Sequence, residues 1–165
     1  MPEMKSDRIK QVVVPRQQAV FWMDGQGRWH NQHGPFEHKK IIDHFNASIH
    51  RDRNGYYVGQ YRDGLFEKVY FPSHETSRFA VNLVGRDQIQ MELNSGEVVA
   101  VAPDLMFIHD DQLFHHYGEE IIKFSESALM QISRHIESDA DGYILRWMGS
   151  NYRLKEQSIP DHTEK

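Results

Sequence analysis

The sequence predicts an α+β protein of two similar lobes, each a curved antiparallel sheet packed on one helix in the order hairpin, helix, hairpin. Two observations lead to this prediction. Apolar residues recur with helical spacing in two short segments, and the flanking segments have the aromatic-rich, Gly-containing pattern of β-hairpins. The two helical segments and the turns after them also correspond at a constant offset of 87 residues, which places Asp52 on Asp139 and Gly55 on Gly142. An internal repeat is therefore expected.

The first lobe begins with a hairpin at residues 19–31, where the glycines of residues 24–27 allow the backbone angles of a tight turn. A helix is predicted for residues 37–49, because its apolar residues fall on one face. That face consists of Ile41, Ile42, Phe45 and Ile49. A second hairpin follows at residues 56–72 and turns at Arg62-Asp63-Gly64.

The second lobe begins with three alternating strands in residues 78–103, the last two joined at Asn94-Ser95-Gly96. A hairpin is predicted for residues 106–117. A helix is then predicted for residues 125–136, because Ser125 is a good N-cap and Phe124 and Leu129 have the spacing of a hydrophobic staple. A last hairpin turns around Gly149-Ser150-Asn151. The pattern thus repeats the helix and hairpin of the first lobe.

The chain divides accordingly into four parts. Residues 1–18 form a polar N-terminal segment, residues 19–78 the first lobe, residues 79–156 the second lobe with its connecting strands, and residues 157–165 a disordered tail. With 165 residues the chain is long enough to bury a core without disulfide or metal support.

Composition excludes several classes of function. The sequence has no cysteine, so it has neither a disulfide framework nor a thiolate site. Net charge is −5, with 19 basic and 24 acidic residues and no basic stripe, so nucleic acid and anionic membranes are not the expected partners. The N-terminal segment lacks the apolar core of a signal peptide, and we expect a soluble cytoplasmic protein. The oligomeric state stays open, a homodimer included.

The repeated Asp-rich turn resembles a calcium loop but lacks a required ligand. Residues 137–148 have acidic residues at loop positions 1, 3 and 5 and Gly142 at position 6. Position 12 is Met148, where an EF-hand needs a bidentate Glu. We therefore interpret both turns as structural helix-to-strand turns, in which Asp52 and Asp139 hydrogen-bond the backbone of the turn itself.

The eleven histidines are the other anomaly, since imidazole binds metals and titrates near neutral pH. They gather in two clusters, His30/His33/His38/His44 and His109/His115/His116. No His-Glu-x-x-His run is present, and adjacent His115 and His116 in a strand point to opposite faces. We expect no bound metal and no cofactor, and the sequence contains no nucleotide-binding, phosphate-loop or Ser-nucleophile motif.

Paired aromatic residues give the strongest indication of a binding site. Trp22 and Trp29 are expected to face each other across the first hairpin, and Tyr57 begins the next one. Most such aromatic residues pack in the core or in cross-strand pairs, but any that are exposed on a sheet can bind a ligand through their rings. The predicted ligand-binding residues are Trp22, Arg28, Trp29, His30 and Tyr57, and no residue is predicted to be catalytic.

The first half of the chain resembles a bacterial family, domain-of-unknown-function family twelve eighty-five. The resemblance rests on DGQGRWHNQHGPFEHKKIIDHF, DRNGYYV and FEKVYF, covers residues 21–81, and continues more faintly to residue 154. It implies a small bacterial protein with two repeated α+β lobes and a ligand-binding or signalling role. The sequence departs from the family pattern at PSHETSRFAV, residues 72–81, where an acidic Val-Glu-Asp-x-Pro-Phe phrase is expected.

Together these observations predict a non-enzymatic module that binds a small molecule or a protein partner, with a regulatory or signalling role. The alternative is a metal-assisted hydrolase built on the histidine clusters. An enzyme would gather histidines and carboxylates in one pocket, whereas a binding module would have an aromatic pocket without a nucleophile–base pair.

Overall fold

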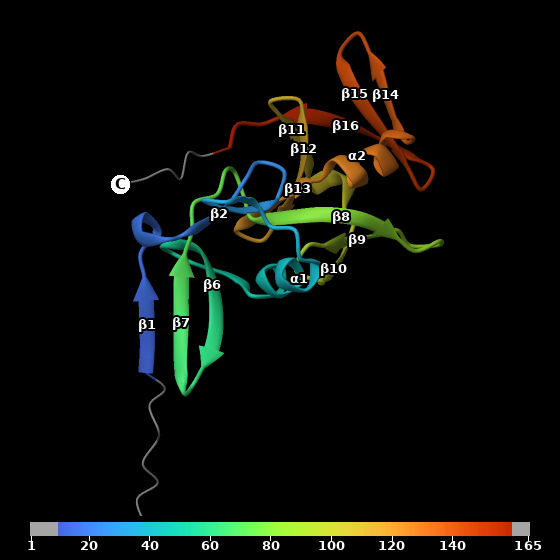
Figure 1. The fold of residues 1–165 in the computed structure, drawn as a ribbon. Coiled ribbons are helices and arrows are strands. Elements are labelled where there is room, and N and C mark those ends of the chain that lie inside the picture. The colour runs from blue at the N-terminus through green and yellow to red at the C-terminus, as the bar shows by residue number, and fades with distance from the viewer. Residues whose placement is uncertain (1–9, 160–165) are drawn as a thin grey trace, which may run out of the picture.

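The computed structural model describes residues 10–159 of the chain, and these residues form an α+β fold with two α-helices and three β-sheets (Figure 1). The predicted α+β class is therefore confirmed. In chain order the elements are β1 (Lys10–Val14), η1 (Arg16–Gln18), β2 (Phe21–Met23), β3 (Trp29–Asn31), β4 (Gly34–Pro35), α1 (Lys39–Ala47), β5 (Ile49–Asp52), β6 (Gly55–Arg62), β7 (Leu65–Tyr70), β8 (Arg78–Val84), β9 (Gln90–Leu93), β10 (Val98–Ala100), η2 (Pro103–Leu105), β11 (Met106–His109), β12 (Gln112–Tyr117), β13 (Glu120–Phe124), α2 (Glu126–Ser133), β14 (Ile136–Asp139), β15 (Gly142–Trp147) and β16 (Ser150–Glu156).

The strands pair into sheets of four, three and nine strands. The four-stranded sheet has the order β1-β7-β6-β5, and the three-stranded sheet has the order β2-β3-β4. The nine-stranded sheet has the order β10-β9-β8-β13-β12-β11-β16-β15-β14. Three ladders, β1 with β7, β8 with β13 and β11 with β16, are parallel. In Figure 1, β1, β6 and β7 extend from one end of the molecule and the β14–β15 hairpin extends from the other.

Two hydrophobic clusters hold these sheets together. One cluster joins the three-stranded sheet to the four-stranded sheet and α1, and its largest buried residues are Trp29, Phe71 and Phe79. The other lies between the nine-stranded sheet and α2, around Phe124, Ile132 and Leu145. Burial of these side chains is the main stabilising contribution to the fold.

Both predicted helices exist, and both are shorter than predicted. The first ends at Ala47, because the chain enters β5 at Ile49, where Ile49 pairs with Val58. The second likewise ends at Ser133, and Ile136 begins β14. The last apolar residue of each predicted helical face therefore belongs to a strand, as suits β-branched isoleucine. Each helix is consequently followed by three strands rather than by one hairpin.

The repeated Asp-rich turn joins two strands, so its interpretation as a helix-to-strand turn is wrong in that respect. Asp52 pairs with Gly55 at the end of β5 and β6, and Asp139 pairs with Gly142 at the end of β14 and β15. The predicted backbone hydrogen bonds are confirmed, because the N–H of Asn54 donates to Asp52 Oδ1 at 2.9 Å. In the second copy the N–H of Asp141 donates to Asp139 Oδ1 at the same distance, 2.9 Å.

The structure describes part of each predicted terminal segment. Within the predicted polar N-terminal segment, residues 10–14 form strand β1. Gln157, at the start of the predicted disordered tail, donates its N–H to the Ile108 carbonyl at 2.9 Å. Residues 160–165 of that tail lie outside the described residues.

Candidate functional site

The first hairpin separates the two tryptophans that the sequence placed opposite each other. Trp22 pairs with His30, and Met23 pairs with Trp29, so the expectation that Trp22 and Trp29 face each other is wrong. Because adjacent strand residues point to opposite faces, the two indoles lie on opposite sides of the three-stranded sheet. Trp29 is 2% exposed and Trp22 is 40% exposed.

Trp29 is a core residue. Its ring packs edge-on against Phe45 and Phe71, with centroid distances of 5.3 and 4.7 Å. Its indole N–H donates to Asn46 Oδ1 at 2.7 Å, which satisfies the one polar group of the side chain. Trp29 therefore supports the hairpin from beneath and is not available to a ligand.

Trp22 and His30 form a stacked pair on the outer face of the same hairpin. Their ring centroids are 5.8 Å apart and their planes differ by 7°. His30 Nε2 lies 2.7 Å from Asp24 Oδ2, which fixes the imidazole. Partial burial acts to raise the pKa of Asp24, but hydrogen bonds from His30 and from the backbone N–H groups of Arg28 and Gln26 lower it overall.

The two other predicted residues differ in their relation to this pair. Arg28 adjoins it, because its backbone N–H donates at 3.0 Å to the Asp24 carboxylate that also contacts His30, and Arg28 is exposed in the turn of the hairpin. Tyr57 belongs to the four-stranded sheet, where it stacks on His50 with a centroid distance of 5.4 Å. The ammonium of Lys68 lies 4.7 Å from the Tyr57 ring centroid. The neighbours of Tyr57 thus come from its own sheet, and the five predicted residues do not form one site.

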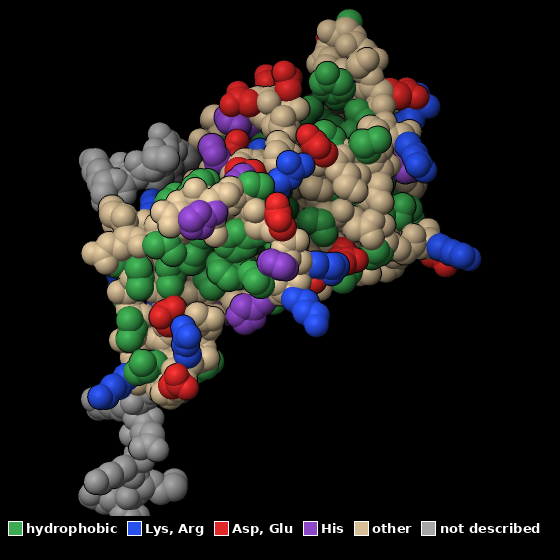
Figure 2. All heavy atoms as spheres, viewed as in Figure 1, with side chains coloured by type: hydrophobic (Ala, Val, Ile, Leu, Met, Phe, Trp, Pro, Cys, Tyr) green, Lys and Arg blue, Asp and Glu red, His purple; other side chains and the backbone are tan. Residues whose placement is uncertain are grey.

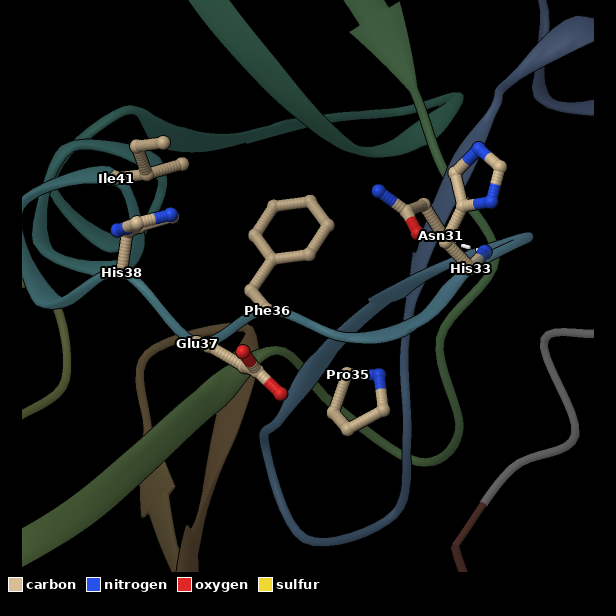
Figure 3. Close-up of a pocket in the computed structure, with 7 residues that line it drawn as sticks. All are labelled: Asn31, His33, Pro35, Phe36, Glu37, His38 and Ile41. Atoms are coloured by element: carbon tan, nitrogen blue, oxygen red, sulfur yellow. Dashed lines mark hydrogen bonds between the residues drawn. The ribbon is translucent and has the colours of Figure 1, made fainter.

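A cleft of about 330 Å³ opens beside this hairpin, between strands β3 and β4 and the start of α1 (Figure 3). It is lined by Asn31, His33, Pro35, Phe36, Glu37, His38 and Ile41. Figure 3 shows the Phe36 ring in the middle, with His38 and Ile41 on the helix side and Asn31 and His33 on the hairpin side.

Local structure explains why these residues surround a hollow. The N–H of Phe36 donates to the Trp29 carbonyl at 2.9 Å, which holds the chain against the hairpin before α1 begins. The Phe36 ring packs on Phe45 of α1 at 5.1 Å and on Trp29 at 6.5 Å. Ile41 points away from this core and is 47% exposed, although the sequence placed it on the buried face of the helix.

The cleft combines an apolar floor with a polar rim. Phe36, Pro35 and Ile41 supply the apolar surface, while the rim carries the imidazoles of His33 and His38, the Glu37 carboxylate and the Asn31 amide. The Asn31 side-chain oxygen accepts the N–H of His33 at 2.9 Å. Such a lining is typical of sites that bind a ligand by shape and a few hydrogen bonds.

One row of side chains connects the cleft with the stacked pair. His30 pairs with Trp22 on one side and with Pro35 on the other. Directly paired residues share a face, so Trp22, His30 and Pro35 lie in one row across the outer surface of the three-stranded sheet. Two of the five predicted residues thus adjoin the cleft through Pro35, which sequence reasoning did not single out.

The histidine clusters do not come together as a metal site. Within residues 10–159 no group of three or more His, Asp or Glu side chains is placed to hold a metal ion. Figure 2 shows histidine side chains at several separate places on the face in view. His115 and His116 point to opposite faces, and His115 is 2% exposed. Burial lowers the pKa of His115, whose Nε2 accepts the N–H of Ala102 at 3.0 Å.

Comparisons with solved structures define the class of fold. The chain is similar to the crystal structure of a DUF1285 family protein from Silicibacter pomeroyi DSS-3, a member of the family twelve eighty-five named above. The TM-score is 0.57 at 13% sequence identity, over 87% of this chain and 81% of the other. A DUF1285 family protein from Shewanella baltica OS155 is similar with a TM-score of 0.48 at 12% identity, over 70% of this chain and 91% of the other.

The first of these two similarities confirms, at the level of the fold, the family resemblance seen in the sequence. A scan against protein-family models and a search of curated proteins both gave no match. Among the helices of residues 10–159, none has the length and apolar character needed to cross a membrane.

Proposed function

We propose that this protein is a non-enzymatic binding module, which holds a small ligand or a segment of a protein partner in the cleft between the first hairpin and α1. The observation that carries the proposal is the cleft itself, in which exposed Ile41 and half-buried Phe36 lie beside four hydrogen-bonding side chains. Its volume of about 330 Å³ falls within the range of ligand sites.

The composition of the lining supports binding rather than hydrolysis. Two imidazoles and one carboxylate border the cleft, but the lining includes no Ser, Thr or Lys nucleophile beside them. Nor do the described residues favour a metal-assisted reaction through a cluster of ligands. A module that passes on a signal by binding needs an apolar contact and directional hydrogen bonds, and this cleft offers both.

We also propose that the two halves of the chain are similar lobes derived from one repeated unit. Helices α1 and α2 are each preceded by a set of three strands and followed by another, and both Asp-x-x-Gly turns have the same backbone hydrogen bond. In the first half, Pro35 of β4 and exposed Ile41 of α1 lie around the cleft. We infer that the first lobe binds and that the second supports it.

A thermal-shift screen with a matched pair of variants tests the proposal. A compound that binds only the folded protein stabilises it by roughly 2.7 kcal/mol at a hundredfold excess over its Kd. Ile41→Glu should abolish the stabilisation by genuine hits. Leu105→Glu is the control, because Leu105 is 44% exposed against 47% for Ile41 but does not line the cleft.

Tryptophan fluorescence gives a second readout of the same hits. Trp22 is 40% exposed, and Trp29 packs on Phe36 of the cleft at 6.5 Å, so both indoles can report binding, whereas Trp147 belongs to the other hydrophobic cluster. Trp29→Ala is unsuitable as a test, because loss of this core side chain costs roughly 3–5 kcal/mol. Hits that survive Ile41→Glu, or saturable turnover of ester, phosphate or glycoside substrates, would refute the proposal.

A further inference from the structure

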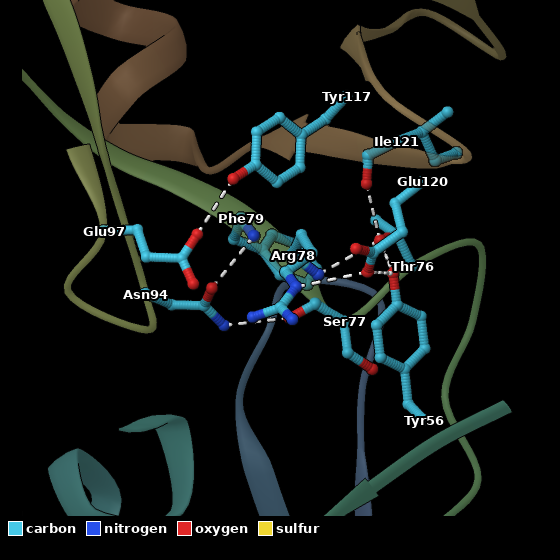
Figure 4. A network of polar contacts seen from close by, with 10 residues as sticks. All are labelled: Tyr56, Thr76, Ser77, Arg78, Phe79, Asn94, Glu97, Tyr117, Glu120 and Ile121. Carbon is cyan, nitrogen blue, oxygen red and sulfur yellow. Dashed lines mark hydrogen bonds and ion pairs between the residues drawn. The ribbon is translucent and has the colours of Figure 1, made fainter. Parts of the chain in front are cut away.

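Arg78 is a nearly buried cation at the start of β8, in the segment where the sequence departs from the family pattern. The residue is 8% exposed, which is unusual for arginine. Figure 4 shows its guanidinium between two groups of polar side chains, with Tyr117 and Glu97 on one side and Glu120, Thr76 and Tyr56 on the other.

Only one of the three guanidinium nitrogens has a hydrogen-bond acceptor within residues 10–159. Arg78 Nε donates to Glu120 Oε1 at 3.2 Å, and neither Nη1 nor Nη2 has a partner in that part of the chain. The side-chain polar atoms that are both enclosed and unpartnered there are Arg16 Nε, Ser77 Oγ and Ser95 Oγ. The Arg78 terminal nitrogens are not among these fully enclosed atoms.

Lys123 is also a nearly buried cation, and its contacts are those of a structural residue. Lys123 is 4% exposed, and its ammonium donates to the Gly25 carbonyl at 2.7 Å and to Glu75 at 3.4 Å. Its hydrogen-bonding capacity is directed at the protein. Arg78 instead has two N–H-bearing nitrogens without a hydrogen-bond partner among residues 10–159.

Surrounding contacts hold the guanidinium in a fixed orientation. Glu120 Oε1 accepts Arg78 Nε and also the Tyr56 hydroxyl at 2.8 Å. The Tyr56 hydroxyl lies 3.1 Å from Thr76 Oγ1, which donates to the Ile121 carbonyl at 2.7 Å. The ordering of a long arginine side chain is therefore already achieved before anything binds, which reduces the entropic cost of binding.

We propose that the Nη1–Nη2 edge of Arg78 is a binding site for a small organic carboxylate. This edge of a guanidinium presents two parallel N–H groups that match the two oxygens of a carboxylate. The neighbouring charges select a monoanion over a phosphate dianion. Glu120 already neutralises Arg78, and Glu97, which accepts the Tyr117 hydroxyl at 3.0 Å, adds a negative charge on the other side. The site is separate from the proposed cleft, because none of these residues lines it.

The test is an NMR titration of the arginine side-chain Nε–Hε signals, with sodium acetate as the probe. Sodium phosphate and sodium chloride at matched ionic strength are the comparisons. We expect the Arg78 signal to shift saturably with acetate, at least several-fold more weakly with phosphate, and without saturation with chloride. Equal, non-saturating shifts with all three salts would show an ionic-strength effect only and overturn the proposal.

Two variants sharpen this result. Arg78→Lys keeps the charge but removes the two parallel N–H groups, so it should abolish saturable acetate binding followed on backbone amide signals. Arg62→Lys, at the exposed end of β6, should retain this binding. Retention in a folded Arg78→Lys protein would overturn the proposal. If that variant does not fold, Glu97→Gln provides the test, because removal of the negative charge should strengthen phosphate binding about tenfold. An unchanged phosphate affinity would contradict the proposed site.

Discussion

The repeated turn glycines give a prediction whose size follows from the backbone. Gly55 has φ of +115° and Gly142 has φ of +127°, a region that residues with a Cβ rarely adopt. Replacement by alanine at either position should therefore destabilise the protein by about 1–3 kcal/mol. For a chain of this size, that corresponds to a decrease in Tm of roughly 2–12 °C.

The two positions should differ by a predictable amount. A Cβ at Gly142 meets no atom within 4 Å, so Gly142→Ala carries the backbone cost alone. A Cβ at Gly55 would lie 2.8 Å from Arg16 Nη2, which donates to the Asn54 carbonyl at 3.2 Å. Loss of this hydrogen bond adds about 0.5–1.5 kcal/mol to the effect of Gly55→Ala. In an Arg16→Ala background the two glycine variants should become equivalent.

Denaturant and thermal melts of these variants measure the effect. Gly25→Ala is the control, because Gly25 does not have a positive φ and its Cβ would meet the nearest atom, in His74, at an ordinary 3.7 Å. It should be neutral or slightly stabilising. The reasoning fails if Gly142→Ala melts with the wild type, or if Gly25→Ala loses as much stability as the two turn variants.

Three further predictions concern titratable groups. Tyr56→Phe should destabilise the protein by about 1–3 kcal/mol in denaturant melts, because it removes the hydroxyl that Glu120 accepts at 2.8 Å. The paired hydrogen bonds from Arg153 lower the pKa of Asp139 to about 2, below its usual 3.8, so this pair stabilises the fold above about pH 4 and less as the pH falls toward 2. Asp139→Asn should flatten the decrease in Tm over that range. His115 has a pKa lowered by burial and should remain a neutral Nδ1–H tautomer at pH 6.5 in nitrogen-15 NMR spectra, so that acidification below this pH destabilises the fold.

One result would contradict each of these three predictions. Wild-type stability of Tyr56→Phe would mean that Glu120 does not depend on the hydroxyl. A Tm profile of Asp139→Asn parallel to that of the wild type between pH 5 and pH 2 would assign the acid sensitivity to other carboxylates. An imidazolium spectrum for His115 at pH 6.5 would contradict the acceptor role of its Nε2.

Sequence reasoning succeeded where local chemistry determines the structure. Ser125 caps α2 by accepting the Ala128 N–H at 3.2 Å, as its residue type and position predicted. The hairpin turn before Leu65 also follows from local sequence, because Asp63 and Gly64 both adopt positive φ. The ends of the helices were missed, because Ile49 fits an apolar helical face and a strand equally well, and tertiary pairing with Val58 decides between them.

The site was harder to predict for a geometric reason. A shift of one residue in hairpin register exchanges the two faces of a strand, so placing Trp22 opposite Trp29 instead of His30 turned a core residue into a ligand contact. The cleft depends on how α1 sits against the hairpin, which residues 31–41 do not encode in their own pattern. Their histidines and their Gly-Pro step were visible signals, but nothing local showed that they enclose a hollow.

The position of β16 has a consequence for synthesis of the protein on the ribosome. It is the last strand of the described chain, yet it lies inside the nine-stranded sheet, between β11 and β15. Only two residue pairs, Phe107 with Lys155 and Ile108 with Glu156, connect it to β11. Until residues 150–156 leave the exit tunnel, β11 has an unpaired edge and the β14–β15 hairpin has no sheet to join. The nascent chain therefore exposes one edge of β11 until residues 150–156 have emerged, and an unpaired strand edge is a site at which chains aggregate.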